Sequence, residues 1–323
     1  MKKMNGLCLS VAALLILGNC YGQQGKPYKN IQSSLPQAGA VKVMTFNIRA
    51  NNILEGLNKW PLRKQVIFDI FNDNRADVIG LQEVLYAQLQ DVKLVLKQYG
   101  YYAVGRSDGL QGGESCPIFY RKDRFTLLDS GTFWFSDTPS VSGTKDWGNI
   151  VPRICSWVYL REKGQNAGFY VYNLHLACTS QNSREKSVRL LAKQVAERKT
   201  RDKFVVIGDF NMELHNPAMK YLMKFGYQTP YPKMVDAWMS VHPGQSDVST
   251  SRGIGGWVSG PKIDHIQMCE NAKALEVTID SRRLNDRYAS DHFPVVAKIL
   301  LTPPTQVAGL DYKKDRVANA ALN

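Results

Sequence analysis

Short apolar runs alternate with amphipathic segments along the chain between residues 41 and 301. The series opens with an expected strand, Val41 to Phe46, and continues with Leu62 to Phe71, whose apolar residues recur at helical spacing. Pro61 suits the first turn of that helix, because its nitrogen carries no hydrogen that would be left unpaired there. The alternation continues without a linker-like break, so the pattern predicts one α/β domain whose sheets are covered by helices.

The remaining expected elements follow the same two patterns. Further helices are expected at 86–98 and 183–199, and Ser183 is the expected N-cap of the second. Further strands are expected at the apolar runs 78–81, 118–120, 125–135, 154–160, 169–176, 204–208, 263–268 and 294–300.

Polar side chains collect where these strands end or just beyond. Strand ends bring distant sequence positions to one rim of a sheet, so a site built from many short segments is expected there. The residues concerned are Asn47, Glu83, His175, Asp209, Asn211, Asp291 and His292.

The first residues have the pattern of a secretory signal. Lys2 and Lys3 precede an apolar run, Val11 to Leu17, and small residues follow up to Gly22. Cleavage is expected after Gly22. The alternative is lipoprotein processing at Cys20, although the preceding asparagine is a poor fit to a lipobox.

These features predict an exported protein, periplasmic or extracellular. The apolar run is too short to span a bilayer, so no transmembrane segment is expected in the mature chain. The predicted organisation is a signal peptide (1–22), a flexible leader (23–40), one domain (41–301) and a C-terminal tail (302–323).

Composition and charge limit the possible classes of protein and of partner only a little. The chain has 323 residues, of which 44% are hydrophobic, as in a globular protein. The net charge is +13, and loss of Lys2 and Lys3 with the signal would leave +11. Such a surface attracts polyanions, which is compatible with nucleic acid, phospholipid headgroups or sugar phosphates as partners. No protein partner is expected.

The cysteines do not suggest a metal site. Two of the six belong to the signal, and the others stand singly, without a CxxC pair, in or next to apolar runs. We expect buried thiols. The alternative is that two of the four cysteines form a disulfide in an oxidising compartment. The four residues are Cys116, Cys155, Cys178 and Cys269.

Two short segments carry the strongest candidate chemistry. Asp209 and Asn211 follow an apolar strand two residues apart, so they project to one side and can together hold a hard cation and a water. Asp291 and His292 place an acid beside an imidazole before a strand. Each also has an ordinary interpretation, as a turn residue or a structural histidine. Glu83, directly after a strand, could equally be a helix cap.

The other histidines are expected to be structural: His215, His242 and His265.

Seven motifs in order resemble those of the deoxyribonuclease I-like endonuclease/exonuclease/phosphatase superfamily, most closely its secreted bacterial members. They are TFNIRANN, IGLQEV, GGESCPIFYRKDRF, YNLHL, VVIGDFN, GPKIDHI and YASDHFPV. The resemblance covers essentially residues 41–301. It implies a four-layer α/β sandwich, in which two mixed sheets pack face to face and helices lie outside.

The resemblance also implies a role for each site residue. Metal binding falls to Glu83, Asn47 and Asp291, and phosphate contacts fall to Asn47, Arg49 and Arg153. The catalytic residues are Asp209 and Asn211, which position water and phosphate, His292 with its orienting acid Asp264, and His175 with its orienting acid Glu114. A donor set of carboxylates and amides without cysteine favours Mg²⁺ or Mn²⁺.

The expected reaction is in-line hydrolysis of a phosphate ester by a metal-aligned water, without a covalent enzyme intermediate. The first substrate hypothesis is nucleic acid, which would make the protein a phosphodiesterase of the nuclease type. The basic charge favours it, and so does the match of Glu114 to the histidine-orienting acid of the nuclease branch that the chain resembles. The alternative is a small or lipid phosphoester, such as a phosphoinositide, sphingomyelin or a sugar phosphate. A third reading, a non-catalytic binding protein, predicts lost site residues. The loops 136–149 and 253–258, with Trp147 and Trp257, are expected to shape the mouth of the pocket.

Overall fold

The computed structural model describes residues 39–301, apart from 52–55, 225, 227, 253–259 and 284–287. All described residues belong to one compact unit, Gln37–Asn323. The predicted signal peptide, most of the leader, the C-terminal tail and the segment 253–258 lie outside the described residues.

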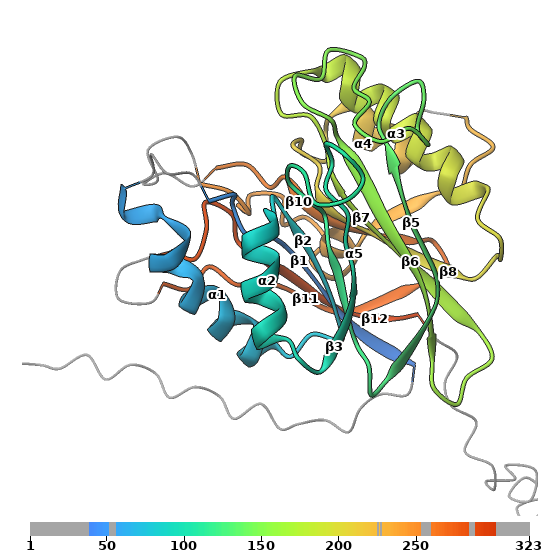
Figure 1. The fold of residues 1–323 in the computed structure, drawn as a ribbon. Coiled ribbons are helices and arrows are strands. Elements are labelled where there is room, and N and C mark those ends of the chain that lie inside the picture. The colour runs from blue at the N-terminus through green and yellow to red at the C-terminus, as the bar shows by residue number, and fades with distance from the viewer. Residues whose placement is uncertain are drawn as a thin grey trace, which may run out of the picture. The chain divides into compact units, whose positions relative to one another are not determined.

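Two six-stranded sheets form the centre of this unit (Figure 1). The first has the strand order β11 (Lys273–Ile279), β12 (Val295–Leu300), β1 (Ala40–Asn47), β2 (Val78–Gln82), β4 (Ile118–Arg121) and β3 (Tyr99–Tyr102). The second has the order β5 (Phe125–Trp134), β6 (Ile154–Glu162), β7 (Gly168–His175), β8 (Lys203–Asp209), β10 (Asp264–Cys269) and β9 (Met234–Asp236). Both sheets are mixed, because β1 pairs in parallel with β2 and β7 with β8, whereas the other pairs are antiparallel.

Helices cover the outer face of each sheet. On the first sheet, α1 (Trp60–Asn74) and α2 (Tyr86–Val95) share an apolar core with β1 and β2. On the second, α3 (Gln181–Ala196) and α4 (Pro217–Leu222) pack on β7 and β8 (Figure 1). The short helices η1 (Gly56–Asn58) and α5 (Ala237–Val241) complete the set. This is the predicted four-layer α/β sandwich.

The two sheets are held together by a layer of apolar side chains. Each buried aliphatic side chain contributes about 1.5–3 kcal/mol relative to exposure. The layer includes Val43, Val78, Val171, Val205 and Ile207.

None of the helices in the described part of the chain combines the length and the apolar character that crossing a bilayer requires.

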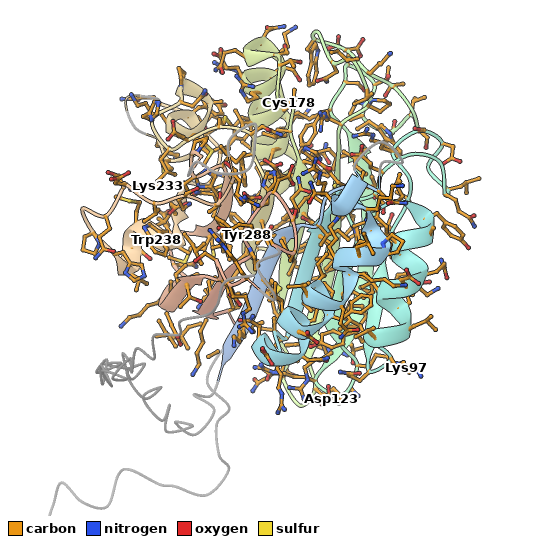
Figure 2. The ribbon with its side chains drawn as sticks, turned by 90° about the vertical axis from the view of Figure 1, so that its left-hand side faces the viewer. Lys97, Asp123, Cys178, Lys233, Trp238 and Tyr288 are labelled. Carbon is orange, nitrogen blue, oxygen red and sulfur yellow. The ribbon has the colours of Figure 1, made fainter. Side chains whose placement is uncertain are left out.

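The pairing of the strands brings the predicted site residues to one end of the domain. The parallel pairs end side by side, with Asn47 next to Gln82 and His175 next to Asp209. Antiparallel β10 starts at this end, because Asp264 pairs with Asp209. Figure 2 labels Cys178, shortly after β7, at this end of the domain, and Lys97 and Asp123 at the other.

Some local predictions were wrong. The N-cap of α3 is Ser180, whose side chain accepts a hydrogen bond from the Ser183 backbone N–H, while Ser183 itself is buried inside the helix. The helix expected to reach residue 98 ends at Val95. Ala40, assigned to the leader by its sequence, already belongs to β1.

Candidate active site

Three chain segments turn sharply as they leave their strands. Arg49, Glu83 and Asn211 adopt left-handed backbone conformations, with φ of 58°, 61° and 52°. Such conformations cost a residue other than glycine free energy and often mark functional sites. Two of the turns are stabilised in the same way: the Asn47 Oδ1 atom accepts from the Arg49 N–H at 2.9 Å, and the Asp209 Oδ1 atom accepts from the Asn211 N–H at 2.9 Å.

The amide of Asn47 connects the two sheets. Its Nδ2 donates to Glu83 Oε1 at 3.1 Å and to Asp209 Oδ2 at 3.0 Å. Asn47 and Asp209 are buried, and the second oxygen of Glu83 accepts from the Ala50 N–H at 2.9 Å. Two carboxylates from different sheets are therefore held around one side-chain amide.

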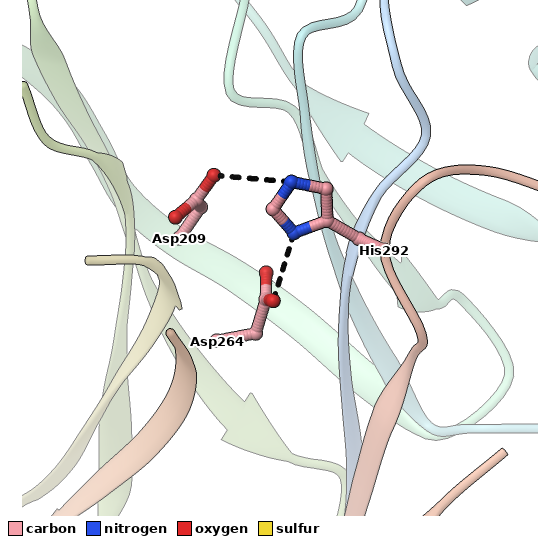
Figure 3. A group of neighbouring side chains, drawn as sticks. All are labelled: Asp209, Asp264 and His292. Carbon is pink, nitrogen blue, oxygen red and sulfur yellow. Dashed lines mark hydrogen bonds and ion pairs between the residues drawn. The ribbon is translucent and has the colours of Figure 1, made fainter. Parts of the chain in front are cut away.

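A second pair of side chains adjoins Asp209. The Nδ1 atom of His292 lies 2.8 Å from Asp264 Oδ2, and its Nε2 lies 3.8 Å from Asp209 Oδ2 (Figure 3). Burial opposes a charge on this imidazole, but the carboxylates of Asp264 and Asp209 outweigh it and raise the pKa of His292 well above its ordinary value. Burial also raises the pKa of Asp209. Both groups therefore favour their protonated forms, and His292 does so because two acids face its ring.

His175 lies on the other side of Asp209, with its Nε2 3.5 Å from Asp209 Oδ2. Burial, reinforced by the charges of Arg153 and Arg106, lowers the pKa of His175 well below its ordinary value, so this imidazole stays neutral.

The predicted hydrogen bond between His175 and Glu114 is not formed. His175 Nδ1 and Glu114 Oε2 are 4.0 Å apart, beyond hydrogen-bonding distance. Both oxygens of Glu114 instead face Arg106, at 2.7 and 2.8 Å. A guanidinium fork binds a carboxylate more strongly than a neutral imidazole does, which explains the difference.

Arg153 is buried beside this pair rather than exposed at the surface. It is only 9% exposed, and its Nη1 makes no hydrogen bond with the described residues. It lines a cavity of about 10 Å³ together with Glu83, Glu114 and His175. A buried N–H without an acceptor is costly, so this cavity suits an anionic oxygen.

Arg49 and Asp291 lie at the edge of the site. Arg49 Nη1 is 3.3 Å from Asp291 Oδ2, and the Asp291 side chain is 40% exposed. Its other oxygen accepts from the Ser290 hydroxyl at 3.2 Å. Asp291 thus faces an arginine rather than the cluster formed by Asn47, Glu83 and Asp209.

Asn211 points back into the fold. Its Nδ2 donates to the Leu176 carbonyl at 3.0 Å, which ties the exit of β8 to the exit of β7.

The donor atoms of the site fit a hard divalent cation. Ligand atoms of Asp209, Asp264 and His292 lie within 4.8 Å of one another, so these three residues could hold an ion. Asp264 Oδ1 is buried without a hydrogen-bond partner among the described residues. Mg²⁺ prefers oxygen ligands to a protonated imidazole. The carboxylates of Asp209 and Glu83, which accept from the same Asn47 nitrogen, are therefore better ligands for it than His292.

A model of the Endonuclease/Exonuclease/phosphatase family matches residues 44–298. The chain belongs to this family. The endonuclease/exonuclease/phosphatase of Bacteroides vulgatus is 29% identical, with 81% of this chain and 99% of that chain covered and a TM-score of 0.74. A mannosyl-6-phosphatase of Bacteroides thetaiotaomicron is 28% identical, with 80% and 99% covered and a TM-score of 0.71.

A nuclease is also among the relatives of this family member. The CCR4-Not complex 3'-5'-exoribonuclease subunit of Aspergillus clavatus is 27% identical over 134 residues, which are 36% of this chain and 20% of that protein. The family fixes the class of chemistry, and this chain is therefore a phosphoesterase of the endonuclease/exonuclease/phosphatase family.

Sequence patterns missed a polar layer beneath this family site. Gln82 Nε2 donates to Asn173 Oδ1 at 2.6 Å, and Asn173 Nδ2 donates to the Leu81 carbonyl at 2.9 Å. A Cβ atom on Gly80 would lie 2.9 Å from Asn173 Cγ, so only glycine leaves room for this contact between the sheets. The layer supports the strand ends that carry Asn47.

Arg106 was also missed. Its backbone N–H donates to the Glu114 carbonyl at 2.9 Å, within a hairpin of residues 105–115. The glycine-rich sequence of that segment is the signal that could have revealed a tight turn bringing the two side chains together.

Other sequence candidates have structural partners. His265 is fully buried, and its Nε2 lies 2.9 Å from the Met212 carbonyl. Trp147 donates to Asp137 and lies under the Lys186 ammonium, so this ring is engaged in packing contacts. The four cysteines in the described part of the chain are all free, and Cys178 is exposed, contrary to the expected burial.

Proposed function

We propose that this phosphoesterase depends on a divalent cation, Mg²⁺ or Mn²⁺, held chiefly by Glu83 and Asp209. The observation that carries the proposal is the Asn47 amide, which holds carboxylates of both sheets at 3.1 and 3.0 Å. Two acids held beside one donor keep carboxylate oxygens of both sheets in one place, as ligands of a shared hard cation would have to be.

The bound cation would neutralise charge on the scissile phosphate and favour ionisation of a water. The residues of the chain do the rest. Asp209 orients the attacking water, and His292, fixed by Asp264, holds a proton that it can donate to phosphate or leaving-group oxygen. Neutral His175 offers an N–H to the phosphate, and Arg153 Nη1 offers another from the small cavity.

The decisive test is turnover of a generic phosphodiester and a generic phosphomonoester, with and without EDTA. Activity should disappear with EDTA and return with Mg²⁺ or Mn²⁺. Glu83→Gln should lower turnover by about 10³-fold, since it removes a charged ligand while keeping the shape. The exposed Glu197 provides a matched control, Glu197→Gln, which should behave like the wild type. Full activity in EDTA, or in Glu83→Gln, would remove the metal assignment.

Two substrate classes have specific support. A nuclease activity is supported by the basic net charge of +13 and by the similarity to an exoribonuclease subunit. A sugar phosphatase is supported by the similarity to a mannosyl-6-phosphatase, which extends over most of the chain. The preference for nucleic acid also relied on a Glu114–His175 pair, and Glu114 is bound to Arg106 instead. We therefore favour a small phosphate ester.

A substrate panel separates the two classes. A hexose phosphate should be hydrolysed with a kcat/KM that depends weakly on salt, because few phosphate contacts are involved. Plasmid and oligonucleotide should be poorer substrates. If cleavage of nucleic acid is faster and KM rises steeply with salt, the nuclease assignment replaces this one.

We further propose that the protein is exported, in line with the secreted bacterial branch that it resembles. The signal pattern of Lys2, Lys3 and the apolar run supports this, and the catalytic domain would then span residues 41–301. Mass spectrometry of protein from the cell envelope and medium tests it. A mature N-terminus at residue 23 is expected, a lipidated Cys20 would establish the alternative, and an uncleaved cytoplasmic chain would contradict export.

A further inference from the structure

A cavity of about 210 Å³ lies between α2 and the hairpin 105–115. One face of α2 lines it, because the lining residues lie three, four and seven positions after Tyr86 and so share one side of the helix. They are Tyr86, Leu89, Gln90 and Lys93. Leu110 and Gln111 line it from the hairpin.

The same hairpin separates this cavity from the active site. Gly105 and Gly113 line the larger cavity, whereas their neighbours Arg106 and Glu114 line the small cavity beside His175. Ser115 lines both. The larger cavity therefore lies beside the active site, on the other side of one hairpin.

Exposed apolar groups surround the larger cavity. Tyr86 is 44% exposed, Tyr101 41% and Leu110 74%, and these are three of the few large apolar residues exposed on the described part of the chain. Apolar groups gathered at a surface hollow are typical of a binding site.

The polar lining suits a hydroxylated ring that belongs to an anionic molecule. Lys93 is the only charged residue lining the cavity. Its Nζ donates to Gln90 Oε1 at 3.2 Å and lies 4.8 Å from the centre of the Tyr101 ring. Gln90 and Gln111 add amide donors and acceptors, as hydroxyl groups require.

A stacked nucleobase fits less well. The Tyr101 ring already packs against Phe119, with centroids 5.7 Å apart, and against Lys93. The other aromatic residue of the lining is Tyr86, and a single ring can cover one face of a sugar but cannot clamp a base from both sides.

We propose that this cavity binds the sugar ring of the substrate's alcohol part. The proposal rests on the proposed phosphoesterase activity and adds its substrate class, a phosphate ester of a sugar. The sugar could belong to a free sugar phosphate or to a nucleotide, and the experiment includes both.

The test compares a hexose 6-phosphate, a dinucleotide and the ringless ester glycerol 1-phosphate. Tyr86→Ala and Lys93→Met should each raise KM for the ring-bearing substrate by about tenfold, the effect of losing roughly one good contact. Because kcat should change little, the ratio of kcat/KM between ring-bearing and ringless esters should fall by about the same factor. Leu94→Ala, on the same helix and 65% exposed outside the lining, is the matched control.

A ratio that does not change in Tyr86→Ala and Lys93→Met overturns the proposal. The ring-bearing substrate that responds, hexose phosphate or dinucleotide, identifies the source of the sugar. Binding is also measured without turnover, by NMR titration of hexose 6-phosphate into the wild type and Tyr86→Ala. If no ester is hydrolysed, the proposed activity fails. In that case, weaker binding of hexose 6-phosphate to Tyr86→Ala than to the wild type would still support the cavity as a sugar site. Equal binding to both proteins, or no binding to the wild type, would refute it.

Discussion

At the scale of single residues, the side chains of His292 and Asp264 form a hydrogen-bonded pair. The Nδ1–Oδ2 contact of 2.8 Å leaves Nε2 as the ring nitrogen that is turned towards Asp209. A carboxylate that orients an imidazole contributes through that imidazole, so the two side chains should not contribute independently.

We therefore predict strongly non-additive losses. His292→Ala should lower kcat by about 10²–10⁴-fold, because a positioned proton donor contributes that much. Asp264→Asn should cost less, and the double variant should be no worse than His292→Ala alone. Steady-state kinetics of the three variants measures this. Losses that multiply in the double variant would show that Asp264 acts through another group.

At the scale of elements, Gly208 lets β8 run close to β7 just before Asp209. Its φ is 147°, and a Cβ atom there would lie 2.1 Å from the Leu174 carbonyl oxygen. Backbone cannot yield as a flexible side chain can, so any larger residue must push the strands apart just before Asp209.

Gly208→Ala should therefore destabilise the fold by about 2–4 kcal/mol and lower activity as well. Gly164→Ala is the control, because Gly164 also has a positive φ, of 82°, but nothing lies within 4 Å of its Cβ position. Urea unfolding of both variants measures the difference. Equal stability of the two variants would mean that the strands accommodate the added methyl group.

The junction of β9 and β10 contains a buried ion cluster outside the catalytic residues. Asp236 lies 3.6 Å from the Lys262 ammonium and 3.1 Å from His265 Nδ1. Burial alone would raise the pKa of Asp236, but Lys262 and His265 outweigh it and lower the pKa to about 2. Stability from this group is complete above about pH 4 and is lost as the pH falls through about 2.

The free energy of unfolding should thus fall by about 2 kcal/mol less in Asp236→Asn than in the wild type between pH 4 and pH 2. At pH 7 it should destabilise the protein by about 3–5 kcal/mol, because Lys262 would stay buried without its partner. Urea unfolding at several pH values tests both effects. The exposed Asp247 supplies the control, Asp247→Asn, which should have the slope of the wild type. The same slope in Asp236→Asn would refute the assignment.

The sequence predicted long, apolar elements better than short, local ones. Strands such as β7 and β8 carry apolar runs that only burial explains, so their positions were evident. The three-residue β9 and the strand β11, in which only two of seven residues are buried, lack such a run, and α4 has only six residues. Pairing across the sheets fixes these elements, and single-sequence patterns do not contain that information.

The same division applies to the site. Motifs indicated which acids and imidazoles to consider, because their residue types are unusual at strand ends. They could not indicate that Arg106 binds both oxygens of Glu114. That outcome depends on the hairpin geometry and on competition for the carboxylate between a cationic guanidinium and a neutral imidazole.

At the scale of the whole molecule, the site lies across the boundary between the two sheets. Glu83 follows β2 of the first sheet, and Asp209 ends β8 of the second. A cation held by both carboxylates would therefore bind only when the sheets are packed together, and binding to the folded state alone stabilises that state.

We expect Mg²⁺ to raise the melting temperature as it fills the site. At 100 times its dissociation constant, the gain is about 2.7 kcal/mol, or roughly 5–10 °C for a domain of this size. Differential scanning calorimetry after EDTA treatment measures the gain. NaCl of equal ionic strength should give little change, and Glu83→Gln should lose most of the effect because only one sheet would still supply a carboxylate. An equal rise in Glu83→Gln would place the stabilising cation elsewhere, and no rise in the wild type would mean that the two carboxylates do not share an ion.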